Sequence, residues 1–222
     1  MGKKFRVGLI RVLTSDDQDF INLHGKVIMD LFPDIEVESM CIPDQWEGIH
    51  SPELGDIAIP KIIETAHKFK DIDMLLVSCA DDPGVEELRK EFPNIPVTGG
   101  GETTVAIASK YGSKIGVLGI VDYAPRAYCR MIPEKICAIV RPDGVESTLD
   151  LMTDAGKEKC IRAAQTLKDA GAEVIALACT GLTTIGIAST LEAAVGIPVI
   201  DPVIAEGLFC YYEALKKKHF VL

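Results

Sequence analysis

The sequence predicts an α/β protein made of two similar halves, each with a four-stranded, mainly parallel sheet flanked by helices. Two observations carry this prediction. Short β-rich runs alternate with longer helical patterns along the chain, and the pattern restarts near residue 115. The repeat aligns residues 6–10 with 114–118, 73–79 with 173–179, and 95–97 with 197–199. An internal repeat of this kind indicates two copies of one structural unit.

In the first half, apolar and alternating runs predict strands, and helical periodicity predicts the segments between them. The expected strands are Phe5–Ile10, Ile35–Met40, Met74–Val77 and Ile95–Val97. The expected helices are Ile21–Phe32, Ile57–Phe69 and Val85–Phe92. The run Met74–Val77 is apolar throughout, which is typical of a parallel strand buried on both faces.

The second half repeats this order. The expected strands are Ile115–Ile120, Ile136–Val140, Val174–Ala178 and Ile197–Ile200. The expected helices are Tyr123–Met131, Ala155–Ala170 and Ile185–Ala194, followed by a last helix over Ile204–Lys218. We assign residues 1–98 plus 206–222 to the first domain and residues 99–205 to the second.

Composition excludes several classes of function. The chain has 222 residues and a formal net charge of -10, so a basic surface for nucleic acid is not expected. No apolar stretch reaches the ~18 residues that a membrane span needs, and no secretory signal precedes the first strand. We therefore expect a cytoplasmic protein that acts on a small molecule. Its seven cysteines contain no CxxC pair, so a zinc ribbon or a disulfide framework is not expected.

Two cysteines occupy equivalent positions in the repeat. Cys79 and Cys179 each follow the third expected strand of their half, 100 residues apart. Ligands of parallel sheets bind at the carboxyl ends of the strands, and a helix that starts there favours a thiolate. If the halves face each other, the two thiols flank one cleft. One could then remove a proton from a carbon while the other returns one to the opposite face, as in a two-base racemase.

The residues around both cysteines resemble a known family. Ser-Cys-Ala-Asp-Asp-Pro-Gly-Val at 78–85 is similar to the first cysteine motif of hydantoin racemases, and Ala-Cys-Thr-Gly-Leu at 178–182 resembles the second. The resemblance to the aspartate/glutamate/hydantoin racemase superfamily covers essentially the whole chain. It implies two pseudo-two-fold-related α/β domains with the active site in the cleft between them. It also implies no cofactor, and Cys79 and Cys179 as acid and base.

The first loop, Arg11–Asp17, lacks the asparagines that hydantoin racemases typically have, and Thr180 is more usual in amino-acid racemases of the superfamily. A 5-substituted hydantoin or a related cyclic ureide is our first choice of substrate. An acidic amino acid is the alternative; its side chain would need a cation, for which Arg11 is the obvious candidate. A maleate-type cis-trans isomerase and a non-catalytic binding protein are further alternatives.

Other residues near the two motifs are candidates for substrate contact. The candidates are Thr14, Asp81, Thr103, Tyr123, Thr180 and Gly181. The Asp81–Gly84 segment is equally suited to capping the next helix, and Gly99–Gly101 could be either a tight turn that opens a helix or a ligand contact. We expect no metal site, structural roles for the other five cysteines, surface positions for the four histidines, and a homo-oligomer.

Overall fold

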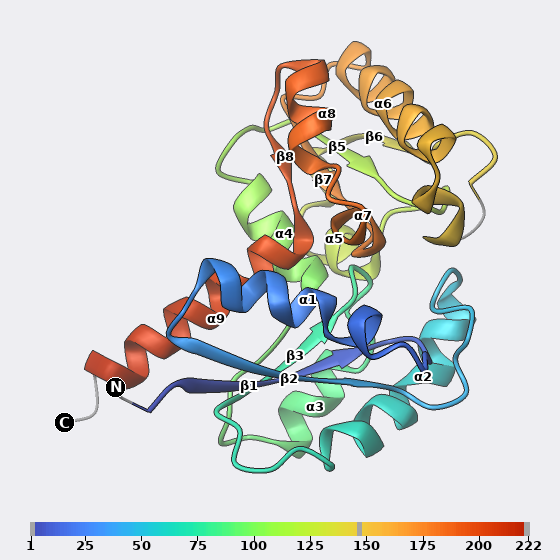
Figure 1. Cartoon of the computed structure of the whole chain (residues 1–222). Coiled ribbons are helices and arrows are strands. Elements are labelled where there is room, and N and C mark those ends of the chain that lie inside the picture. Colours follow the sequence, from blue (N-terminus) through green and yellow to red (C-terminus); the bar gives the residue numbers. More distant parts are fainter. Residues whose placement is uncertain (1–2, 146–147, 220–222) are drawn as a thin grey trace. The chain divides into compact units, whose positions relative to one another are not determined.

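A computed structural model describes residues 3–145 and 148–219, which form two compact units (Figure 1). The first unit comprises residues 1–100 and 203–222, and the second comprises residues 101–202. The chain therefore passes from one unit to the other between Gly100 and Gly101, and returns between Pro202 and Val203. The expected α/β class, with two parallel four-stranded sheets and flanking helices, is confirmed.

The first sheet has the order β2-β1-β3-β4, and every pair of neighbouring strands is parallel. Its strands are β1 (Phe5–Arg11), β2 (Ile35–Cys41), β3 (Met74–Ser78) and β4 (Val97–Gly99). The register pairs Arg11 with Ser78 and Val77 with Gly99. Consequently the segments that follow β1, β3 and β4 all emerge at the same carboxyl edge of this sheet.

Helices cover both faces of the first sheet. α1 (Gln18–Leu31) and α9 (Pro202–His219) lie on one face, and α2 (Pro52–Ala66) and α3 (Val85–Glu91) lie on the other (Figure 1). On β3, Met74 and Leu76 pack in the α1–α9 core, whereas Leu75 and Val77 pack in the α2–α3 core. Because alternate side chains of this strand enter two different cores, an uninterrupted apolar run is required.

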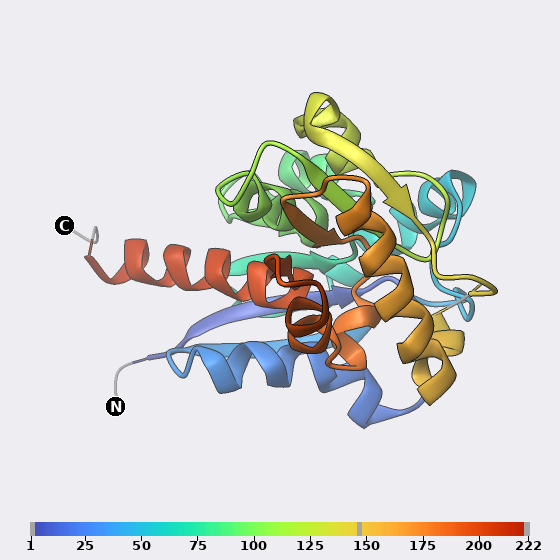
Figure 2. The same ribbon diagram turned by 90° about the horizontal axis from the view of Figure 1, so that it is seen from above.

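The second sheet repeats the topology with the order β6-β5-β7-β8. Its strands are β5 (Ile115–Leu118), β6 (Ile136–Val140), β7 (Val174–Leu177) and β8 (Val199–Ile200). Its helices are α4 (Gly100–Ala108), α5 (Arg126–Met131), α6 (Asp154–Asp169), α7 (Gly181–Thr184) and α8 (Ala188–Val195), with 3₁₀ turns at Pro133–Lys135 and Thr148–Met152. The orange helix α6 runs beside the yellow edge strand β6 in Figure 2.

Several expected boundaries differ from the observed ones for local reasons. Prolines delay two strands: Pro96 and Pro198 have no N–H for the ladder, so β4 and β8 each begin two residues later than expected, directly after the proline. The helix expected over 185–194 begins only at Ala188, as α8, and the separate single turn α7 precedes it, because Gly186 adopts a φ of +62° between them. α2 begins earlier than expected, since Ser51 Oγ accepts a hydrogen bond from Leu54 N at 3.2 Å and caps it.

Candidate active site

The carboxyl edge of the first sheet carries Cys79. This residue follows β3 directly, is half-buried, and packs against the apolar core under α2 and α3. The loop after β1 and the start of α4 flank it, because β1 and β4 are the two strands that pair with β3. Thr14 and Asp81, both candidates from the sequence, are half-buried in the loops at this same edge.

The turn after Cys79 is tightly built. Asp82 N donates to Cys79 O at 3.3 Å, and both Asp82 and Gly84 adopt left-handed backbone with φ of 53° and 73°. Of the two interpretations of the Asp81–Gly84 segment, capping by an aspartate side chain is not observed: Gly84 is the N-cap residue and no side chain caps α3. A positive φ at this position favours Gly, which explains the Pro-Gly pair. Since α3 begins only at Val85, the turn separates Cys79 from the helix N-terminus that we expected beside it.

Asp82 instead packs against the end of β4. Its side chain is buried, and a Cβ built on Gly99 would lie only 2.1 Å from its Oδ1 atom. No side chain larger than hydrogen fits at Gly99 while Asp82 keeps this position. The glycine-rich segment is thus needed for close packing of the Cys79 turn. Asp81 is half-buried beside it and is the aspartate of the pair that is more accessible to a ligand.

Thr14 and Arg11, which the sequence places together in the first loop, both have structural partners. Thr14 Oγ1 donates to Ile42 O at 2.7 Å and accepts from Gln45 N at 2.8 Å, so this hydroxyl joins the loops that follow β1 and β2. Arg11 is the last residue of β1 and is 3% exposed. Its Nη1 atom donates to Phe20 O at 2.7 Å, and its guanidinium lies 4.9 Å from the centre of the Phe20 ring. The guanidinium is therefore engaged with the start of α1.

The second unit places Cys179 at the corresponding edge of its own sheet. Cys179 follows β7 after Ala178 and is half-buried. Thr180 precedes the single-turn helix α7, and Gly181 opens it. The end of α7 is tied to β8 by Thr183 Oγ1, which donates to Asp201 Oδ1 at 2.8 Å in a buried position. Cys179, Thr180 and Gly181 are thus consecutive residues on a short segment held at both ends.

The remaining candidates of this unit differ in exposure. Tyr123 lies in the loop after β5 and is 38% exposed, while Thr103 lies on α4 and is buried. β5 pairs with β7, so the Tyr123 loop and the Cys179 segment both emerge at the carboxyl edge of the second sheet. The buried Tyr128 hydroxyl donates to Leu177 O at 2.9 Å and fixes the end of β7.

The other five cysteines comprise two buried thiols, two exposed thiols and Cys41, which is half-buried. Cys160 and Cys210 are fully buried. Burial, with a smaller contribution from Cys179, raises the pKa of Cys160 to about 11. Burial also raises the pKa of Cys210, with a further contribution from the Glu206 carboxylate. Cys129 and Cys137 are exposed, so the expected packing role holds for the buried pair and is wrong for these two.

Sequence reasoning missed a buried polar cluster behind Cys79. His24, Ser78 and Glu206 are at most 1% exposed and are joined by hydrogen bonds. The expectation that all histidines lie on the surface is therefore wrong for His24. One sequence signal could have found the cluster: Glu206 is the only charged residue between Asp201 and Glu213, in a segment that is otherwise without charge.

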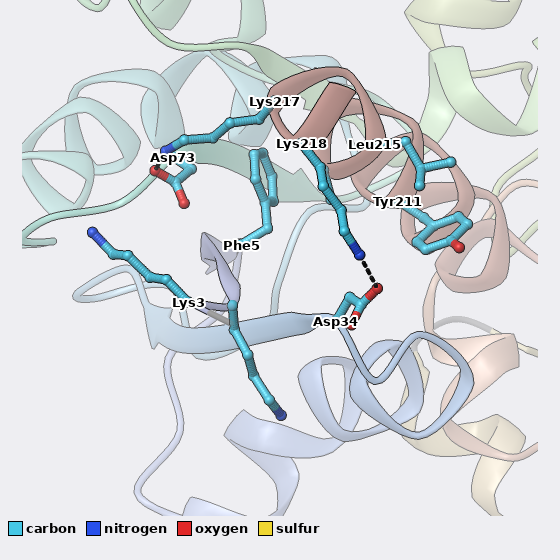
Figure 3. A pocket seen from close by; sticks show the side chains of 10 residues that line it. Lys3, Phe5, Asp34, Asp73, Tyr211, Leu215, Lys217 and Lys218 are labelled. Atoms are coloured by element: carbon cyan, nitrogen blue, oxygen red, sulfur yellow. Dashed lines mark hydrogen bonds and ion pairs between the residues drawn. The ribbon is translucent and has the colours of Figure 1, made fainter. Parts of the chain in front are cut away.

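A separate cavity of about 400 Å³ lies at the opposite, amino-terminal edge of the first sheet (Figure 3). Its lining comes from the starts of β1, β2 and β3 and from the end of α9: Lys3, Lys4, Phe5, Asp34, Asp73, Tyr211, Ala214, Leu215, Lys217 and Lys218. Lys217 pairs with Asp73, and Lys218 lies 3.9 Å from Asp34. None of the candidate site residues lines this cavity.

Over the described residues, no three His, Cys, Asp or Glu side chains gather as a ligand set for a metal ion. In the same part of the chain, no helix is both long and apolar enough to cross a membrane.

Comparison with known proteins places the chain in a family. The Asp/Glu/hydantoin racemase family matches residues 27–206, which is most of the chain. The chain belongs to the Asp/Glu/hydantoin racemase family. The resemblance stated from the two cysteine motifs is thereby confirmed, and with it the expectation of an isomerase of the racemase type.

Two curated relatives are hydantoin racemases. The one from Paenarthrobacter aurescens is 29% identical over 174 residues, which cover 72% of this chain and 70% of that protein. The one from Pseudomonas sp. (strain NS671) is 27% identical over 164 residues, which cover 67% of this chain and 62% of that protein. The solved structure of allantoin racemase from Pseudomonas fluorescens has the same fold, with a TM-score of 0.78 and 20% identity over 94% of this chain and 90% of that one.

Proposed function

We propose that the protein is a cofactor-independent racemase or epimerase in which Cys79 and Cys179 form an acid/base pair. The observation that supports this most strongly is the placement of the two thiols. Each half-buried cysteine follows the third strand along its half of the chain, in two sheets with the same strand order. A chain that contributes the same reactive group from two equivalent edges can serve both faces of a flat intermediate.

In the proposed reaction, one cysteine acts as a thiolate and removes the proton from a carbon next to a carbonyl. The C–H electron pair passes into an enolate, and the second cysteine, as a thiol, returns a proton to the opposite face. The first cysteine ends as a thiol and the second as a thiolate, so the opposite enantiomer is processed with the roles exchanged. Thr180 and Gly181 follow Cys179 directly and are our candidates for supporting the enolate oxygen.

The proposed substrate is a 5-substituted hydantoin or a related cyclic ureide. A ring of this kind offers N–H donors and carbonyl acceptors, which suit the half-buried carboxylate of Asp81 and the hydroxyl of Thr180. Two relatives are hydantoin racemases, and a solved structure with the same fold is an allantoin racemase, which supports the same choice.

An acidic amino acid is the second candidate. Its side-chain carboxylate needs a cation. Because its α-proton is far less acidic than that of a hydantoin, the site would have to stabilise the carbanionic intermediate more strongly than it would for a hydantoin. Arg11, the cation that we considered for this purpose, is buried and donates to the backbone of Phe20. This engagement favours the ureide.

Hydrogen exchange tests the cysteine pair. Wild-type protein in D₂O should racemise a chiral hydantoin and incorporate deuterium at the racemised carbon. Cys79→Ala and Cys179→Ala should each abolish racemisation while the circular dichroism spectrum stays native. Each Cys→Ser variant should retain at most exchange of one enantiomer. Cys137→Ser, which alters an exposed thiol on β6, is the matched control and should keep full turnover. Near-wild-type racemisation by either alanine variant would refute the two-base mechanism. Wild-type protein that exchanges no carbon-bound hydrogen with D₂O would be a binding protein and not a racemase.

A substrate panel separates the two candidate substrates. Asp81→Ala should lower turnover of a hydantoin about 5- to 150-fold, because the ring N–H loses its acceptor and an unpaired buried polar group costs ~1–3 kcal/mol. Asp16→Ala changes an exposed carboxylate of the first loop and should leave turnover unchanged. Activity on aspartate or glutamate alone, with none on hydantoins, would reject the ureide. The expected homo-oligomer and cytoplasmic location stay predictions, which light scattering and cell fractionation would test.

A further inference from the structure

A chain of buried polar groups runs behind Cys79. His24 on α1 lies with its Nδ1 atom 2.9 Å from Ser78 Oγ, and Ser78 Oγ donates to Glu206 Oε2 on α9 at 3.0 Å. Both ionisable residues are 0% exposed. A buried carboxylate is costly unless hydrogen bonds and charges compensate it, so this cluster must be organised around Glu206.

The hydroxyl of Ser78 sets the direction of the chain. A hydroxyl has one proton, and Ser78 gives it to the Glu206 carboxylate. The oxygen of Ser78 can then only accept from His24, so His24 must carry its proton on Nδ1. We call these two hydrogen bonds the relay: His24 Nδ1–H donates to Ser78 Oγ, and Ser78 Oγ–H donates to Glu206 Oε2. His24, Cys79 and Cys210 are among the titratable residues near Glu206.

Backbone packing connects this relay to Cys79. Ser78 is the last residue of β3 and is bonded directly to Cys79. A Cβ built on Gly100 would lie 2.5 Å from Glu206 Oε1 and 3.2 Å from the carbonyl oxygen of Cys79. The carboxylate, the Gly100 backbone and the Cys79 backbone are therefore in one close-packed group. The repeat aligns Ser78 with Ala178, which has no hydroxyl, so this link is a feature of the first unit.

We propose that Glu206 is a positioning residue for Cys79, acting through the hydroxyl of Ser78 and held in turn by His24. The relay fixes the end of β3 and the Cys79 turn, so that the thiol is presented in one orientation. This inference rests on the proposed role of Cys79 as an acid/base group. A misplaced thiol slows proton transfer more than it weakens substrate binding, because transfer requires closely aligned atoms.

Two variants and one matched control test the relay. Ser78→Ala introduces the residue that the second unit has naturally, and Glu206→Gln keeps the shape of the side chain but removes its charge. Glu213→Gln is the control, because Glu213 is also a buried carboxylate of α9, seven residues further on, and pairs with Lys216. Ser78→Ala and Glu206→Gln should lower kcat at least about tenfold, with KM within about threefold. Glu213→Gln should change neither constant by more than about twofold.

Two further readouts do not depend on turnover. In protein labelled with ¹⁵N-histidine, four histidines are present, and the His24 signals should show a protonated Nδ1 that shifts in Ser78→Ala and Glu206→Gln only. The rate at which iodoacetamide alkylates Cys79 should change at least about threefold in the same two variants, as measured by peptide mapping.

The outcomes separate this inference from the proposed function. Wild-type protein that racemises nothing would refute the proposed function, while the His24 spectrum and the Cys79 alkylation rate would still decide whether the relay positions Cys79. An unprotonated Nδ1 in the wild type would overturn the relay. So would kinetics and alkylation rates in folded Ser78→Ala that match those of Glu213→Gln.

Discussion

Replacing Gly99 by alanine tests how the Cys79 turn is packed. Gly99 ends β4, and a Cβ at this position would lie 2.1 Å from Asp82 Oδ1 and 2.5 Å from its Cγ. Real Cβ atoms do not approach other atoms this closely. The backbone of Gly99 does not need a positive φ, so the clash with Asp82 is the main obstacle to alanine. Gly99→Ala must therefore push the Asp82 side chain, and with it the turn that begins at Cys79.

The magnitude follows from two opposing effects. Forcing an extra methyl group into a packed site typically costs ~1–3 kcal/mol. Alanine in place of glycine restricts the unfolded chain, which stabilises the folded state by ~0.4–1 kcal/mol. Asp82 is buried and sits in a left-handed turn, so it cannot swing freely into solvent. We expect Gly99→Ala to lower the free energy of unfolding by about 1–2 kcal/mol.

Urea denaturation followed by circular dichroism measures this change, and the double variant with Asp82→Gly isolates its cause. Removing the Asp82 side chain makes room for the new methyl group, and glycine tolerates the positive φ of that position. The two substitutions should therefore be non-additive, with a favourable coupling of about 1 kcal/mol or more. Gly99→Ala should also lower racemase turnover, because the displaced turn begins at Cys79.

Either of two results would refute this reasoning. Gly99→Ala with wild-type stability and turnover would mean that the contact with Asp82 is not maintained in solution. Strictly additive effects in the double variant would mean that the cost arises somewhere other than at Asp82.

Two further predictions concern the thiols. In a variant in which the exposed Cys129 and Cys137 are replaced by serine, iodoacetamide should alkylate Cys79 or Cys179 first, and a bound hydantoin should slow that reaction. Peptide mapping measures the labelling of each thiol, and faster labelling of a buried thiol would contradict the placement of the site. Burial raises the pKa of Cys160 from 9.0 to about 11, so the unfolded chain ionises this thiol first and stability should fall between about pH 9 and pH 11, by up to about 2–3 kcal/mol. Cys160→Ala should flatten that part of the curve of unfolding free energy against pH, and an unchanged slope would show that this thiol does not cause it.

Local patterns were sufficient to predict the fold class and the equivalence of the two halves. Met74–Val77 is apolar at every position because its side chains alternate between two cores, so the run itself reveals a strand covered on both faces. The position of Cys79 and Cys179 after equivalent strands is likewise readable, because parallel strands place their carboxyl ends at one edge. Single prolines and Gly186 moved element boundaries by a few residues without changing the order of the elements.

The partners of isolated polar residues were decided only by the tertiary structure. From the sequence, Arg11 is a candidate cation for a substrate carboxylate, yet the structure buries it against the start of α1. The sequence predicts a surface position for His24, yet it is buried and lies beside Ser78. Glu206 lies in an uncharged segment of α9, more than 120 residues from Ser78, from which it accepts a hydrogen bond. Periodicity shows which face of an element is buried, because that depends on neighbours along the chain. Which buried polar group meets which depends on how distant elements pack against each other, and no local pattern of residues encodes that contact.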